Sequence, residues 1–155
     1  MKYLDLAIAN ETIKTTNIKG KEYAEVNQRI KAFRSICPCG SIVTEMLSNE
    51  NGMCVFKATI CDEEMRVLGT GTAYEKETSS YINKTSYIEN CETSAVGRAL
   101  GMCGIGADVS IASADEVMNA IVNARIEAEV KKRIHELCPK PVTKDDIFAS
   151  INYLI

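Results

Sequence analysis

The sequence predicts an α+β fold: a three- or four-stranded antiparallel β-meander with helices packed on one face. Three apolar runs separated by short turn sequences indicate the meander. Apolar residues at spacings of three and four, before and after these runs, indicate the helices. The chain has 155 residues, 46% hydrophobic and 25% charged, which is the balance of a globular protein. We expect one domain, residues 1–155, with a C-terminal helical region at 113–155.

Two elements are expected before the meander. Residues 11–18 alternate weakly and are rich in Thr and Ile, so they predict a short edge strand that ends at Lys19 and Gly20. Residues 23–36 predict a helix, because their apolar side chains share one helical face. These side chains are Tyr23, Val26, Ile30, Phe33 and Ile36. Pro38 and Gly40 then favour a turn.

The meander is predicted at residues 41–48, 53–61 and 65–76, with the turns NENG and DEE between the strands. In the second strand one face is apolar and is expected to lie in the core. It consists of Cys54, Phe56, Ala58 and Ile60. In the third strand, Gly69, Gly71 and Ala73 share a face, which predicts a groove for bulky helix residues.

A helix is predicted at residues 86–103, with an apolar stripe from Ile88 to Met102. Gly97 and Gly101 lie on its other side, although each glycine costs a helix about 1 kcal/mol relative to alanine. They allow another backbone to approach closely, leave room for a ligand or a second subunit beside Arg98, or do both. Further helices are expected after Ser113 and after Thr143, where capping residues precede amphipathic runs.

Charge is unevenly distributed along the chain, whose net charge is −3. Residues 1–34 hold seven Lys and Arg against four Asp and Glu, and residues 35–124 hold five against twelve. Residues 125–155 hold six against five. The acidic middle segment opposes binding to phosphate and suits a basic protein partner.

Catalytic and metal sites are not indicated, so we expect a non-enzyme without cofactor. The chain has a single histidine, His135, within a charged run, and its seven cysteines lack zinc-site spacing. The glycines of GMCGIG follow a helix and are not in the order that binds phosphate. Without an export signal or a long apolar segment, the chain is expected to be cytoplasmic, with reduced thiols and no membrane contact.

The run ETSAVGRALG, followed by GIG and preceded by a three-stranded meander, resembles the Sak/Erf-type single-strand annealing proteins of phage recombination. The similar part spans residues 23–106. The whole chain also looks like small phage and prophage proteins. This resemblance implies a β-β-β-α core, assembly into a homo-oligomer, and binding of single-stranded DNA in recombination or replication.

The resemblance also implies the residues that contact DNA. Arg98 matches the basic position of the family's helix. Further positive charge would come from Lys57, Arg66, Lys76 and Lys84. Tyr74, Tyr81 and Tyr87 are candidate base-stacking side chains.

Three hypotheses about function remain open. The chain is either a DNA-binding protein or a protein-binding module of the same fold, such as a phage inhibitor of a host enzyme or defence system. A small molecule between sheet and helix is a third possibility, without a recognisable ligand motif.

Overall fold

A computed structural model describes residues 3–79, 83–112 and 114–137 of the chain. Residues 1–120 form one compact unit and residues 121–155 a second, and each is described by itself. The first unit begins with α1 (Tyr3–Glu11), the hairpin strands β1 (Thr15–Ile18) and β2 (Lys21–Ala24), and α2 (Val26–Ile36). The strands β3 (Ser41–Glu50), β4 (Met53–Cys61) and β5 (Val67–Lys76) follow. A short 3₁₀ helix, η1 (Glu77–Ser79), leads to α3 (Asn83–Met102), and α4 spans Ala114–Leu137.

The predicted α+β class and the predicted meander are confirmed. β3, β4 and β5 form a three-stranded antiparallel sheet in that order, while β1 and β2 form a separate two-stranded sheet. The predicted core face of β4 is buried: Cys54, Ala58 and Ile60 are fully enclosed, and Phe56 is 6% exposed. The alternation of apolar and polar residues along β4 therefore identified its inner face correctly.

The N-terminal elements differ from those predicted. The strand expected at 11–18 is limited to β1, because Glu11 ends α1. Tyr23 belongs to β2 and not to the following helix, which begins at Val26. Lys19 and Gly20 both have positive φ, as a two-residue hairpin turn requires, so β2 folds directly back on β1. A four-residue strand is too short for alternation to distinguish it from a helix start.

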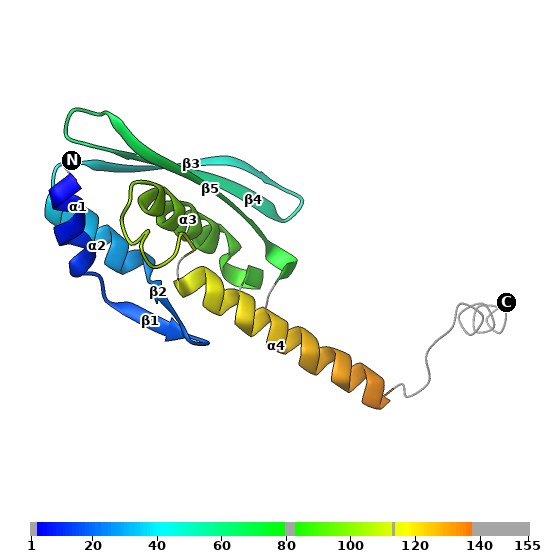
Figure 1. The fold of residues 1–155 in the computed structure, drawn as a ribbon. Helices are drawn as coiled ribbons and strands as arrows, with labels where there is room; N and C mark the ends of the chain where they lie inside the picture. The colour runs from blue at the N-terminus through cyan, green and yellow to red at the C-terminus, as the bar shows by residue number, and fades with distance from the viewer. Residues whose placement is uncertain (1–2, 80–82, 113, 138–155) are drawn as a thin grey trace. The chain divides into compact units, whose positions relative to one another are not determined.

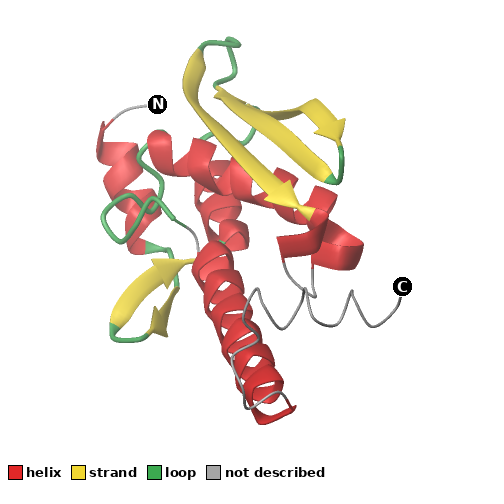
Figure 2. Cartoon of the chain, turned by 90° about the vertical axis from the view of Figure 1, so that its right-hand side faces the viewer, coloured by secondary structure: helices red, strands yellow, loops and turns green. Residues whose placement is uncertain are grey.

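The helix α3 lies against one face of the three-stranded sheet (Figure 1). Figure 2, turned by 90°, shows the strands of this sheet on one side of the helices of the same unit. The groove predicted on β5 is confirmed, but its occupant is not bulky. A Cβ added at Gly71 would overlap the backbone nitrogen of Ala99, and one at Gly69 would lie 2.9 Å from the Ala99 carbonyl oxygen. The backbone of α3 therefore fills the groove, together with the Cys103 side chain beside Gly69.

The remaining helix predictions are only partly correct. α3 starts three residues earlier than expected, with a kink at Ser86, whose φ and ψ are non-helical. Met102, predicted to be in the apolar stripe, is 65% exposed. The sequence after Ser113 predicts an amphipathic helix, but Val130 and Ile134, two of its apolar residues in the second unit, are exposed. Ser113 and the helix predicted after Thr143 lie outside the described residues.

Candidate nucleic-acid interface

One end of the three-stranded sheet gathers polar groups from three segments, and we call it the turn end. It comprises the β3–β4 turn (residues 49–52), the end of β5 with η1 (residues 75–79), and the start of α3 (residues 83–87). Asn51 and Gly52 have φ values of 52° and 70°, which form a tight hairpin turn. The backbone N–H of Glu77 donates to the Gly52 carbonyl oxygen at 2.8 Å, so the turn is joined to the residue that follows β5.

Asn83 fixes the start of α3 at this end. Its side chain is buried, and its Nδ2 donates to Glu75 Oε2 at 2.6 Å and to Ser79 Oγ at 2.8 Å. Its Oδ1 accepts from Asn90 Nδ2 at 2.8 Å. Buried amides hold their neighbours firmly because an unmade hydrogen bond is costly there. Lys84, which follows Asn83, is exposed in the first turn of α3, whose start is held in place by the hydrogen bonds of Asn83.

A hollow of 440 Å³ lies at the turn end. Its lining combines one cation, one anion, an amide and two hydroxyls, from Lys76, Glu50, Asn51, Ser48 and Thr78. Gly52 and Met53 complete the lining. Such a mixture of donors and acceptors suits ribose hydroxyls and phosphate oxygens better than an apolar ligand.

The structure does not bring the predicted contact residues into one groove. Lys76 and Lys84 both lie at the turn end and are exposed. Lys57 lies in the middle of β4, in register with Glu45 and Thr72, on the face of the sheet opposite α3. Tyr74 lies on that same face and is 66% exposed.

The two predicted arginines are each engaged by carboxylates. Arg66 lies in the β4–β5 connection, with its Nε 2.7 Å from Asp62 Oδ2 and its Nη1 3.3 Å from Glu64 Oε2. Burial opposes ionisation of Asp62, but hydrogen bonds from the Arg66 side chain and from two backbone N–H groups outweigh it, so the pKa of Asp62 is lowered. Arg98 Nε lies 2.9 Å from Glu116 Oε1. Phosphate would have to compete with these carboxylates.

The predicted aromatic contacts have different surroundings. Tyr87 is half-buried against the core, and its hydroxyl donates to Asn49 Oδ1 at 3.0 Å. That bond ties α3 to the β3–β4 turn, so its role at the turn end is to position the segments. Tyr81 lies outside the described residues.

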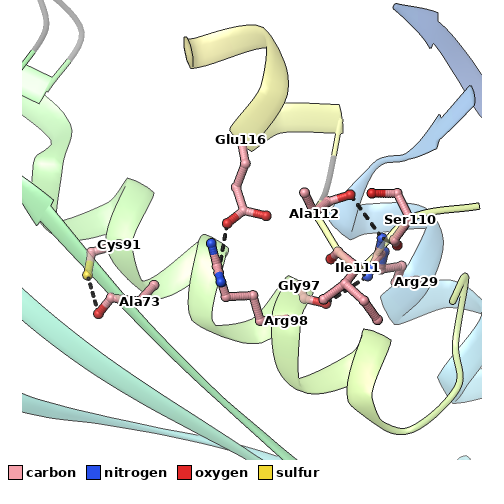
Figure 3. A network of polar contacts seen from close by, with 9 residues as sticks. All are labelled: Arg29, Ala73, Cys91, Gly97, Arg98, Ser110, Ile111, Ala112 and Glu116. Atoms are coloured by element: carbon pink, nitrogen blue, oxygen red, sulfur yellow. Dashed lines mark hydrogen bonds and ion pairs between the residues drawn. The ribbon is translucent and has the colours of Figure 1, made fainter. Parts of the chain in front are cut away.

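Arg29 is a buried residue that the sequence interpretation missed. It is fully enclosed, and its Nη1 donates to the carbonyl oxygens of Gly97 at 3.0 Å and Ile111 at 3.1 Å (Figure 3). Its Nη2 donates to the carbonyl oxygens of Ser110 and Ala112. Burial lowers the pKa of Arg29, and the nearby Glu116 carboxylate partly offsets that shift. The sequence could have indicated that Arg29 is buried, because it lies on the apolar face of the helix between Val26 and Phe33.

Arg29 also corrects the interpretation of the glycine stripe on α3. A Cβ added at Gly101 would lie 2.6 Å from Arg29 Nη1. The missing side chain at Gly101 therefore makes room mainly for a guanidinium group from α2, and the Ile111 carbonyl oxygen lies 3.6 Å from the same position. The close backbone approach occurs instead on the other side of α3, at Gly69 and Gly71.

Five of the six cysteines in the described part of the chain are buried core residues, and Cys39 is exposed. Burial raises the pKa of the Cys91 thiol to about 12 and that of the Cys103 thiol to about 12, so both stay protonated at neutral pH. Within residues 3–79, 83–112 and 114–137, no three His, Cys, Asp or Glu side chains are grouped to hold a metal ion. No helix in this part of the chain is both long and apolar enough to cross a membrane.

Comparison with known proteins corrects the family resemblance. Residues 30–103 match the family model described as Slr1353 N-terminal dsRNA-binding domain-like. The matched segment runs from within α2, through the three-stranded sheet, to the residue after α3. The resemblance to Sak/Erf-type annealing proteins was therefore wrong: the features that suggested it, a meander followed by a small-residue helix, belong to a segment that matches a different family. No curated protein and no solved structure matches the chain. Over slightly less than half its length, this chain is similar to the Slr1353 N-terminal dsRNA-binding domain-like family.

Proposed function

We propose that residues 30–103 form a nucleic-acid-binding domain that recognises double-stranded RNA through the turn end. The observation that carries this proposal is the match of this segment to a family described as dsRNA-binding domain-like. Proteins recognise duplex RNA largely by shape, through contacts to 2′-hydroxyls and phosphates across the minor groove. Such recognition requires well-positioned polar groups more than a strongly basic surface.

The turn end supports the proposal on chemical grounds. Its backbone is held by the bonds of Gly52, Asn83 and Tyr87, so its polar groups are presented in a fixed arrangement. The amide of Asn51 and the hydroxyls of Ser48 and Thr78 can bond to ribose hydroxyls. Lys76 and Lys84 supply the positive charge for two phosphates. The domain acts by binding, without catalysis.

The first experiment measures binding of a labelled RNA duplex of about 16 base pairs, the length that double-stranded RNA-binding domains span. Fluorescence anisotropy at low salt, with unlabelled competitors of the same sequence, compares duplex RNA with duplex DNA, single-stranded RNA and single-stranded DNA. We expect duplex RNA to compete best, because only it combines A-form shape with 2′-hydroxyls. Preference for single-stranded DNA, or no binding to any nucleic acid, would contradict the proposal.

Variants locate the interface. Replacement of Lys84 or of Lys76 by glutamine should weaken duplex RNA binding severalfold and reduce its salt dependence by about one phosphate contact each. Lys14→Gln is the matched control, because Lys14 is also exposed but lies between α1 and β1, outside the matched segment. Equal effects of all three substitutions would show that binding is not localised to the turn end.

A further inference from the structure

The face of the three-stranded sheet opposite α3, which we call the outer face, carries exposed apolar side chains. Met53 lies on this face because it alternates with the buried side chains of β4. Val43 and Tyr74 lie there because they pair with Thr59 and Val55, which alternate with the same buried side chains. Their exposed fractions are 48% for Val43, 38% for Met53 and 66% for Tyr74. The same face also carries the hydroxyl residues Ser48, Thr59, Thr70 and Thr72, and interfaces that form in solution combine apolar and polar side chains in this way.

The charged residues of the outer face are separated by sign. The two acidic residues, Glu45 and Glu50, are both on β3, whereas the basic residues are Lys57 on β4 and Lys76 on β5. Glu45 and Lys57 are direct partners in the register of β3 and β4. The outer face has no net charge, and its Glu50 and Lys76 lie at the end where they also line the hollow of the turn end.

This distribution is complementary to itself. A two-fold axis parallel to the strands and passing between β3 and β4 would place each copy's Glu45 opposite the other copy's Lys57. A two-fold interface uses the same patch on both subunits, so one acid–base pair in the patch produces two contacts. Val43 and Val55, each two residues from one member of the pair and on the same face, flank it and would be removed from water by the same contact.

We propose that the outer face is a self-association surface on which a second copy of this chain packs, with reciprocal Glu45–Lys57 ion pairs across the two-fold axis. The contact is centred on Glu45 and Lys57 in the middle of β3 and β4, whereas Lys76 lies level with Met53 at the end of the outer face and Lys84 belongs to α3. The proposal does not depend on nucleic-acid binding.

Sedimentation equilibrium of the full chain, without nucleic acid, tests the proposal directly. The wild-type chain should change from monomer to dimer as its concentration rises. Glu45→Lys or Lys57→Glu should each weaken association at least about tenfold, because each variant places like charges opposite one another. A mixture of E45K and K57E should form a mixed dimer, since one face then carries both cations and the other both anions. The double variant E45K/K57E should again self-associate.

Controls separate this result from general effects of charge or folding. Glu89→Lys changes the same charge at an exposed position of α3, away from the outer face, and should leave association unchanged. Circular dichroism melting verifies that each variant is folded. A wild-type chain that stays monomeric at every concentration overturns the proposal, as does a mixture of E45K and K57E that does not associate. Photo-crosslinking of Tyr74 to a single-stranded oligonucleotide by a monomeric chain would assign the face to nucleic acid instead and would likewise overturn it.

Discussion

Arg29 illustrates how a single residue organises the first unit. Its guanidinium lies between α2, the glycine stripe of α3 and the loop at residues 110–112, and it donates to carbonyl oxygens from the last two. Burying a charge is costly unless its donors find acceptors, and here four backbone carbonyls accept from the two Nη atoms, whereas the buried Nε has no hydrogen-bond partner in the described part of the chain. Gly101 is the other half of this arrangement, because a methyl group there would collide with Nη1.

Replacement of Arg29 by methionine tests this role. The variant fills similar volume but leaves the carbonyls of Gly97 and residues 110–112 without their donors, so the free energy of unfolding should fall by about 3 kcal/mol or more. Urea denaturation followed by circular dichroism is suitable, because the chain has no Trp. Lys31→Met, at an exposed position of the same helix, should change stability by only about 0.5 kcal/mol. A loss below about 1 kcal/mol for R29M would show that solvent replaces the guanidinium.

At the scale of elements, the contact between β5 and α3 determines the depth of the core. Gly69 and Gly71 lack side chains where α3 crosses the sheet, so the helix backbone approaches the strand directly. This approach brings Cys91, Ala95 and Ala99 onto the buried face of the sheet. It also places the start of α3 beside the β3–β4 turn, which creates the turn end.

Gly71→Ala should therefore destabilise the protein by about 3 kcal/mol or more, although alanine normally favours a strand over glycine. The added methyl group would meet backbone atoms of α3, which cannot rotate away as a side chain can. Thr70→Ala, on the neighbouring exposed position of β5, serves as the control and should change stability by less than about 1 kcal/mol. Equal stability of G71A and the wild type would show that α3 can shift outward at little cost. Thermal and urea unfolding measure both variants.

At the scale of the whole molecule, electrostatics constrain any interaction with nucleic acid. The chain has a net charge of −3, and Arg66 and Arg98 are engaged by carboxylates. Positive charge at the proposed interface is therefore limited to Lys76 and Lys84. The acidic segment also repels phosphate over a distance that salt shortens.

This charge distribution predicts a shallow salt dependence for duplex RNA binding. Two phosphate contacts correspond to a slope of about −2 in a plot of log affinity against log salt, far below that of strongly basic proteins. Anisotropy titrations over a series of salt concentrations measure the slope. A steep slope would mean that further cations contribute, and the interface would then have to extend beyond the turn end.

The meander and the buried face of β4 were predictable because strand alternation and turn residues are local signals. The start of α2 was missed because β2 is only four residues long. Lys76 and Lys84, predicted as DNA contacts, are both exposed. Their location at the same end of the sheet depends on η1 and on the hydrogen bonds of Asn83 to Glu75 and Ser79, which no helix or strand periodicity reveals. Arg66 and Arg98 looked available because their carboxylate partners could not be assigned from sequence.

The sequence by itself determined the α+β class, the order of the strands and the glycine groove on β5, since each follows from the spacing of neighbouring side chains. Only the tertiary structure decided that Arg29 occupies the glycine side of α3 and that Glu116 neutralises Arg98, because these pairs join residues far apart in the chain. It also decided that Glu45 and Lys57 share an exposed face, since cross-strand register depends on the bulge between Met46 and Ser48 and not on sequence separation alone.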